Sequence, residues 1–217
     1  MTRFFYFDLG NVLLAFSHER MCRQMAAVAG SDPDAIRRLV LGSGLHAAEG
    51  SLQQRLERGA LTVDEAFEEF CRRLDVRPDR AALYRASSDI FTPIPGTIAL
   101  VERLSAAGNR LGILSNTNPW DWEFVKVRYA FLNRHFETAV LSYEAGAMKP
   151  ERAIFEQAIA RAGVPAAEIF FVDDRPEHVA GARAAGIDAV HFTTPDALEQ
   201  ALAERRAAGI APQRASP

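Results

Sequence analysis

The sequence has 217 residues, of which 48% are hydrophobic and 24% are charged, and this composition is typical of a folded chain with a sizeable core. The formal net charge of −3 gives no electrostatic reason to expect nucleic acid or an anionic membrane as a partner. Cys22 and Cys71 lack metal-type spacing, and no apolar run reaches the length of a membrane span, so we expect a cytoplasmic protein with reduced thiols.

The first element is an apolar run over 4–7, which we expect to form a strand that ends at Asp8. The following segment to residue 89 contains helical stripes and no convincing strand. Asp32 and Pro33 predict one helix start, and the capping box from Thr62 to Glu65 predicts another. We therefore expect an all-helical insert that ends near the prolines of 92–96.

Beyond the insert, apolar runs alternate with helical stripes. The runs lie at 111–114, 138–141, 169–172 and 189–192. Several of them are apolar throughout, which is typical of strands buried on both faces. Alternation of this kind predicts an α/β fold, a Rossmann-like doubly wound parallel five-stranded sheet with an inserted all-helical cap. The expected division is a core over 1–16 and 93–210, a cap over 17–92 and a disordered tail over 211–217.

Polar residues follow the ends of four of the predicted strands. They are Asp8, the pair Ser115 and Asn116, Lys149 a few residues further on than its strand, and the pair Asp173 and Asp174. Each alone is more often a turn residue, a helix cap or a solvated side chain than a functional residue. Together they converge at the carboxyl edge of one sheet, where acids without a counter-ion would repel one another. Oxygen ligands without His or Cys favour Mg²⁺ as that counter-ion.

This arrangement predicts phosphoryl chemistry on a small phosphorylated metabolite. Asp8 is placed for in-line attack on phosphorus, and an aspartyl-phosphate would form and then hydrolyse. Lys149 would offset charge on the phosphoryl group. The Ser115 hydroxyl and the backbone N–H of Asn116 would bind phosphate oxygens.

These segments resemble the motifs of the haloacid dehalogenase superfamily, in particular its phosphatases with a helical cap, and cover the whole core. The matching segments are 7–13, 114–118, 149–150 and 171–174 with the glycines that follow. The resemblance is closest to glucose-1-phosphate phosphatase-like members and more distant to the phosphatase domain of soluble epoxide hydrolase. It implies that strand 4–7 lies between 111–114 and 169–172. It also implies that the Gly10 carbonyl and Asp174 join Asp8 as metal ligands, and that Asp173 orients Lys149.

One position departs from the superfamily pattern. Most of its phosphatases carry a second Asp two residues after the nucleophile as general acid and base, and here that residue is Gly10. General acid catalysis is worth ~10²–10⁴-fold. We therefore expect leaving groups that need little protonation, such as the anomeric oxygen of a sugar 1-phosphate, unless another group supplies the proton. His18 is the nearest candidate by sequence, although it also reads as a solvated residue at a helix start.

Residues of the cap would select the substrate. Candidates are His46 and the segment 57–59, which read equally well as an exposed helix or turn. Trp120 and Trp122 could stack on a sugar, but their spacing at a helix start is more typical of packing.

Two other functions are compatible with parts of the sequence. A metal-independent haloacid dehalogenase-type hydrolase would also lack the second Asp, but such enzymes usually replace the acidic pair at 173–174 with serines. A catalytically impaired binding module would explain Gly10, but the retention of Asp8, Ser115 and Lys149 argues against decay. The sequence gives no indication of the oligomeric state.

Overall fold

A single parallel sheet organises the chain in the computed structural model, which describes residues 2–42 and 47–207. The strand order is β5–β4–β1–β6–β7, with bounds β1 Phe4–Phe7, β4 Arg110–Ser115, β5 Thr138–Leu141, β6 Ile169–Asp173 and β7 Asp188–His191. In the register, Phe5 lies opposite Leu111 of β4 on one side and Phe170 of β6 on the other. The expected five-stranded parallel α/β sheet with the first strand at its centre is therefore confirmed.

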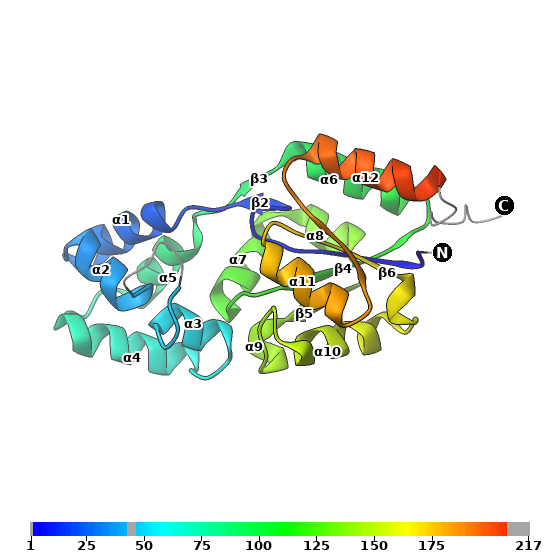
Figure 1. Ribbon diagram of the computed structural model, residues 1–217. Coiled ribbons are helices and arrows are strands. Elements are labelled where there is room, and N and C mark those ends of the chain that lie inside the picture. The colour runs from blue at the N-terminus through cyan, green and yellow to red at the C-terminus, as the bar shows by residue number, and fades with distance from the viewer. Residues whose placement is uncertain (1, 43–46, 208–217) are drawn as a thin grey trace.

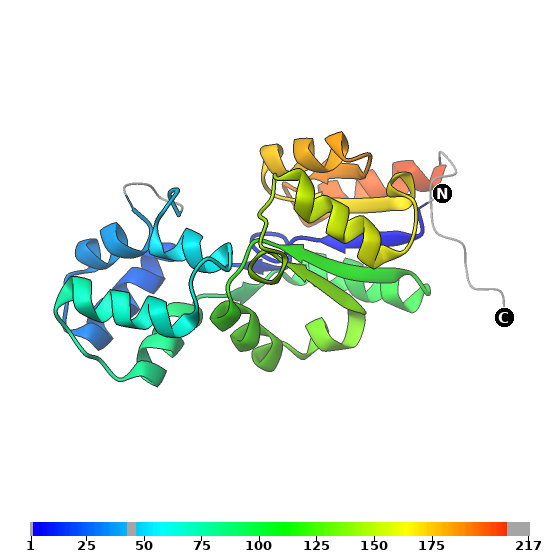
Figure 2. The same ribbon diagram turned by 90° about the horizontal axis from the view of Figure 1, so that it is seen from below.

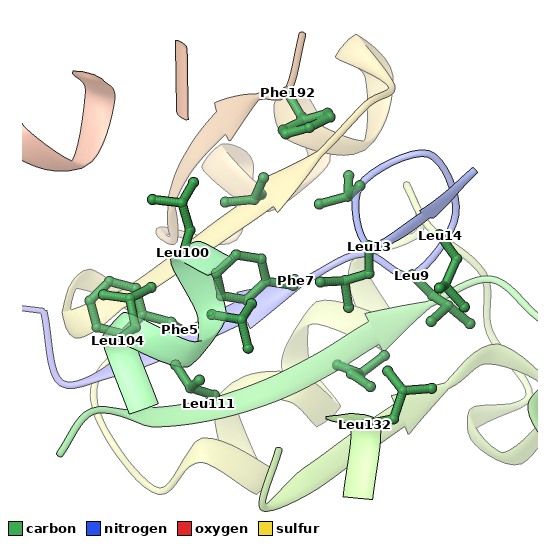
Figure 3. Close-up of a cluster of buried hydrophobic side chains, with 14 of the residues drawn as sticks. Phe5, Phe7, Leu9, Leu13, Leu14, Leu100, Leu104, Leu111, Leu132 and Phe192 are labelled. Carbon is green, nitrogen blue, oxygen red and sulfur yellow. The ribbon is translucent and has the colours of Figure 1, made fainter. Parts of the chain in front are cut away.

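Successive residues of β1 point to opposite faces of the sheet, and each face packs on its own layer of helices. Phe5 and Phe7 join an apolar cluster with Leu100 and Leu104 of α6, as Figure 3 shows, whereas Phe4 and Tyr6 pack on the other face. The first cluster draws on α6 Pro95–Ala106, α7 Pro119–Arg128, α8 Ala130–His135 and α12 Pro195–Ala207. The second draws on α10 Arg152–Ala162 and α11 Pro176–Ala184. The short elements α9 Ser142–Ala145 and η1 Ala166–Glu168 lie in connections.

The segment between β1 and the rest of the sheet folds into helices that stand apart from it in Figures 1 and 2. We call this group the helical lobe and the rest the sheet lobe. The helices are α1 His18–Ala29, α2 Pro33–Val40, α3 Leu52–Glu57, α4 Val63–Leu74 and α5 Arg80–Ser88. They share a separate apolar cluster that includes both free cysteines. Asp32 caps α2 and a complete capping box at Thr62 starts α4, as the sequence predicts.

Two connections cross between the lobes, and they pair with each other. They form the antiparallel ribbon of β2 Leu14–Ala15 and β3 Thr92–Pro93, in which Leu14 lies opposite Pro93 and Ala15 opposite Thr92. The domain limit predicted at 16/17 lies just after β2, and the limit predicted at 92/93 falls within β3. The division into two domains stays a prediction.

The remaining differences from expectation are small. The strand expected at 189–192 runs over 188–191, because Asp188 takes part in backbone pairing although it is polar, while Phe192 leaves the sheet and stays buried in the core. The strand expected at 111–114 extends by one residue at each end. His46 and the predicted tail over 211–217 lie outside the described residues. No helix in the described ranges has the length and apolar character that a membrane crossing requires.

The direction of the sheet places its functional edge. Strand β1 begins at the end of the sheet remote from the helical lobe, so the carboxyl ends of the parallel strands point toward that lobe (Figure 1). Ligands of open α/β sheets bind at this edge.

Candidate active site

The polar residues predicted at the strand ends gather at one cavity. Asp8 directly follows β1, Ser115 ends β4 and Asp173 ends β6. A cavity of about 540 Å³ lies between the two lobes, and its walls include Asp8, Lys149 and Asp174 from the sheet lobe and Glu57 from the helical lobe. Such a volume is ample for a small metabolite.

Lys149 is the centre of a buried clamp at the floor of this cavity. Its ammonium nitrogen donates to Asp8 Oδ1 at 2.7 Å, to Asp173 Oδ2 at 2.5 Å and to the carbonyl oxygen of Leu114 at 2.9 Å. All three donors of the ammonium group are thereby used. Burial by itself lowers the pKa of Lys149, but the carboxylates of Asp173 and Asp8 raise it above its ordinary value, so the side chain is a cation.

Asp173 is held from two further directions. Its carboxylate accepts from the backbone N–H of Arg175 at 2.9 Å, and His178 Nδ1 lies 3.0 Å from Oδ1. Burial raises the pKa of Asp173, but Lys149 and His178 outweigh it and bring the pKa down to about 2. These contacts favour the charged form of Asp173, and its carboxylate holds the ammonium group of Lys149. His178 was not identified from the sequence, because a histidine on a helix gives no signal there.

Asp8, Asp173 and Asp174 offer carboxylate oxygens that all lie within 4.8 Å of one another. Burial and the neighbouring acids Asp173 and Asp174 raise the pKa of Asp8 to about 7, against the lowering effect of Lys149. A divalent cation between Asp8 and Asp174 would remove this repulsion. The oxygen-only donor set fits Mg²⁺.

Asn11 fixes the side chain of Asp174. The backbone of Asn11 lies in the left-handed region with φ 53°, a conformation that Asn tolerates better than most residues. Its Nδ2 donates to Asp174 Oδ2 at 3.0 Å. The sequence shows Asn11 in the first motif, but the contact across 163 positions depends on the sheet order.

A side chain at position 10 would require the ring of Phe16 to shift. A Cβ on Gly10 would lie 2.8 Å from Cε1 of Phe16, closer than real Cβ atoms approach another atom. The ring of Phe16 therefore occupies the space that an acidic side chain at position 10 would need.

Ser115 and Asn116 lie beside the clamp and line the cavity. The Asn116 side chain is engaged with the backbone of Lys149, since Oδ1 accepts from the Lys149 N–H at 2.8 Å and Nδ2 donates to the Lys149 carbonyl at 3.0 Å. Ser115 is buried, and its hydroxyl donates to the Asn116 carbonyl at 3.3 Å, a long hydrogen bond that a phosphate oxygen could replace.

The wall of the cavity opposite the Lys149 clamp carries carboxyl and amide groups. Gln53 Nε2 donates to Glu57 Oε1 at 2.8 Å, both from α3. Asp121 of α7 accepts from Ser88 Oγ of the helical lobe at 2.7 Å and from Asn118 Nδ2 at 2.6 Å. Burial raises the pKa of Glu57 to about 7 and that of Asp121 to about 6. This wall therefore offers hydrogen-bond acceptors, and its carboxyl groups can also donate when they are protonated.

Other residues singled out from the sequence have varied surroundings. His18 begins α1 and lines the cavity, and its ring lies 5.0 Å from that of Phe16. Trp120 packs its ring against Tyr84 of the helical lobe at 3.7 Å, and Trp122 is buried in the sheet lobe. These contacts favour the packing interpretation of both tryptophans.

The amino-acid sequence is similar to one family of known proteins. The sequence model of haloacid dehalogenase-like hydrolases matches residues 3–186. A pyrimidine 5′-nucleotidase of Escherichia coli (strain K12) is 32% identical over 115 residues, which are 51% of this chain and 50% of that protein. A glyceraldehyde 3-phosphate phosphatase of Pyrococcus abyssi is 28% identical over 154 residues, 67% of this chain and 64% of that protein. The matches span 36–64% of the length of three of the curated relatives.

Solved structures agree with the observed fold. A wild-type enzyme of the same family from Bacteroides thetaiotaomicron, solved with magnesium and inorganic phosphate, has a TM-score of 0.75 and 21% sequence identity. The match covers 89% of this chain and 96% of the chain of that enzyme. At this identity the likeness concerns the fold.

Proposed function

This chain belongs to the haloacid dehalogenase-like hydrolases, and we propose that it is a Mg²⁺-dependent phosphatase that hydrolyses a small phosphomonoester through an aspartyl-phosphate on Asp8. The observation that carries the proposal is the clamp in which Lys149 contacts both Asp8 and Asp173 at the cavity floor. The helical lobe serves as a cap that excludes water from this floor.

The donor set fits the metal. Asp8 and Asp174 would hold Mg²⁺ with the backbone carbonyl of Gly10, and Asn11 keeps the Asp174 carboxylate in place. Mg²⁺ bound by these residues would supply positive charge that lowers the repulsion between the carboxylates and the phosphate group. The enzyme from Bacteroides thetaiotaomicron was solved with magnesium and phosphate, which supports this assignment.

The chain's own residues then perform the substitution at phosphorus. A carboxylate oxygen of Asp8 forms the bond to phosphorus while the bond to the leaving-group oxygen breaks, and water later attacks the phosphorus of the aspartyl-phosphate. Lys149 neutralises charge on the phosphoryl oxygens, and Asp173 keeps its ammonium group in position. Ser115 and the backbone N–H of Asn116 provide further donors to those oxygens.

A sugar 1-phosphate is the substrate class that we propose to test first. The cavity wall opposite the clamp offers Gln53, Glu57 and Asp121, whose oxygens accept hydrogen bonds from hydroxyl groups. The rings of Phe16 and Phe91 line the same space and provide apolar contact for a sugar face. The relatives named above act on other small phosphorylated compounds, which supports the reaction class more than any one substrate.

The test is a panel of sugar, nucleoside, alkyl and aryl phosphates, assayed with Mg²⁺ and with excess chelator. We expect release of inorganic phosphate only with Mg²⁺ present, and none from the Asp8→Asn variant. Halide release from a haloacid without Mg²⁺, with no phosphatase activity, would instead support a dehalogenase.

A further inference from the structure

The source of the proton that the leaving group takes up is not given by the residues of the proposed mechanism. When the bond between phosphorus and the leaving-group oxygen breaks, that oxygen carries negative charge unless an acid protonates it. Gly10 has no acidic group, and Phe16 fills the adjacent space. The inference below rests on the proposed function, since it concerns the same reaction.

The donor has to face the leaving group from the side opposite Asp8, because attack at phosphorus is in line. Asp8 attacks from the floor formed by the sheet lobe, so the leaving group points toward the helical lobe. Among the described residues of that lobe, Glu57 is the carboxylic acid that lines the cavity.

The end of α3 is fixed against the sheet lobe, so Glu57 has a defined place. Its backbone carbonyl accepts from Ser142 Oγ at 2.5 Å, and the next residue, Arg58, forms an ion pair with Glu151. Gly59 lies so close to the backbone of Tyr143 that a Cβ would be 2.3 Å from the Tyr143 carbonyl oxygen. Three consecutive residues of the helical lobe therefore contact the sheet lobe, which holds Glu57 at the interface.

Three of the other titratable groups of the cavity are less suitable, whereas His18 of α1, which also lines the cavity, is the alternative donor that the Glu57→Gln variant below distinguishes. Both carboxylate oxygens of Asp121 accept hydrogen bonds, from Ser88 and Asn118. His178 is tied to Asp173, and burial lowers its pKa. Glu177 is exposed and paired with Arg175, and its pKa is lowered by a backbone hydrogen bond. For Glu57, the side-chain hydrogen bond found among the described residues is the one that Gln53 Nε2 donates to Oε1.

We propose that Glu57 is the general acid and base of the reaction, and replaces the Asp that position 10 lacks. In the first step Asp8 forms its bond to phosphorus, the bond from phosphorus to the leaving oxygen breaks, and the Glu57 carboxyl gives its proton to that oxygen. In the second step water attacks the phosphorus, the bond to Asp8 breaks, and the Glu57 carboxylate takes the proton of the water. The products are an alcohol and inorganic phosphate, and both residues return to their starting state.

The surroundings of Glu57 suit an acid that works near neutral pH. Burial raises the pKa to about 7, and the nearby Asp121 adds to the rise, while the hydrogen bond from Gln53 and the charge of Arg175 lower it. An acid with a pKa near the working pH is present in both forms, as the two steps require.

The experiment compares Glu57→Gln with wild type on two esters in the presence of Mg²⁺. One is 4-nitrophenyl phosphate, whose phenolate leaves without a proton, and the other is glycerol 1-phosphate, whose alkoxide requires one. The value of kcat/KM reports the steps up to release of the leaving group. We expect Glu57→Gln to lose ~10²–10⁴-fold on the alkyl ester and less than about tenfold on the aryl ester. Glu156→Gln, the same change at an exposed ion pair of α10, should match wild type on both.

Equal losses on the two esters, or no loss on the alkyl ester, would overturn the assignment of Glu57 while leaving the phosphatase proposal intact. Wild-type activity confined to the aryl ester would overturn it as well, because no acid would then be acting. If wild type hydrolysed neither ester nor any member of the panel, the proposed function itself would fail. Should Glu57→Gln not fold, the wild-type ratio of alkyl to aryl kcat/KM decides: it should fall as the pH rises past about 7, and a constant ratio refutes the inference.

Discussion

Replacing Lys149 with methionine tests the buried clamp most severely. The Lys149 side chain is 1% exposed and its ammonium group contacts two carboxylates and one carbonyl. Methionine keeps most of the volume and removes the charge, so Asp173, which is fully buried, loses its strongest partner. Removal of one member of a buried ion pair costs about 3–5 kcal/mol of unfolding free energy, because the other charge stays without compensation. We expect a loss in this range, together with the loss of activity.

The assay is denaturant unfolding at several pH values without added metal. The deficit should shrink as the pH falls, because Asp173 can then take up a proton in place of its lost partner. The Lys149→Met/Asp173→Asn double variant should recover part of the stability. The sequence has one other lysine, Lys126, which is partly exposed and paired with Glu123. Lys126→Met should cost less than about 1 kcal/mol. If both methionine variants lost equally little, or if the deficit did not depend on pH, the clamp would not be the electrostatic centre described above.

Three further predictions concern other parts of the cavity. Gly10→Asp should cost about 1–3 kcal/mol of unfolding free energy through overlap with Phe16. In the Gly10→Asp/Phe16→Ala double variant, removal of the ring should recover part of this loss. If denaturant unfolding showed that the effects of the two single changes simply add, the overlap would not be the cause. Mg²⁺ at about 100 times its Kd should raise the unfolding free energy by ~2.7 kcal/mol, and a thermal shift of equal size in Asp174→Asn would contradict the ligand assignment. Since the pKa of Glu57 is raised from 4.5 to about 7, its contribution to stability is full below 4.5 and is lost as the pH rises to 7. Relative to wild type, Glu57→Gln should therefore gain stability across this window, by at most ~3 kcal/mol, and a constant difference would refute the raised pKa.

The strand-end residues could be predicted because parallel strands bring their carboxyl ends to one edge. Asp8, Lys149 and Asp173 are far apart in the sequence. The order of the strands in the sheet brings all three to the same edge. The start of α4 could also be predicted, because the capping box from Thr62 to Glu65 is a local pattern within four residues. Local patterns and strand ends together therefore account for most of the fold and for the floor of the cavity.

What could not be predicted depends on contacts between distant surfaces. The ring of Phe16 against Gly10 and the contact of His178 with Asp173 follow from packing, which no periodicity in the sequence records. The ribbon of β2 and β3 has only two residues in each strand, too few to show alternation. Glu57 appeared in the sequence as one candidate among several cap residues. The docking of α3 on the sheet lobe is what separates it from the others.

Trapping of the phosphorylated enzyme tests the central claim most directly. Wild type, mixed with substrate and Mg²⁺ and quenched with acid within one turnover, would be digested and its peptides examined by mass spectrometry. The account predicts one added phosphoryl group on the peptide that contains Asp8, and none in Asp8→Asn. A phosphoryl group on another residue, or phosphate release by Asp8→Asn at the wild-type rate, would contradict it.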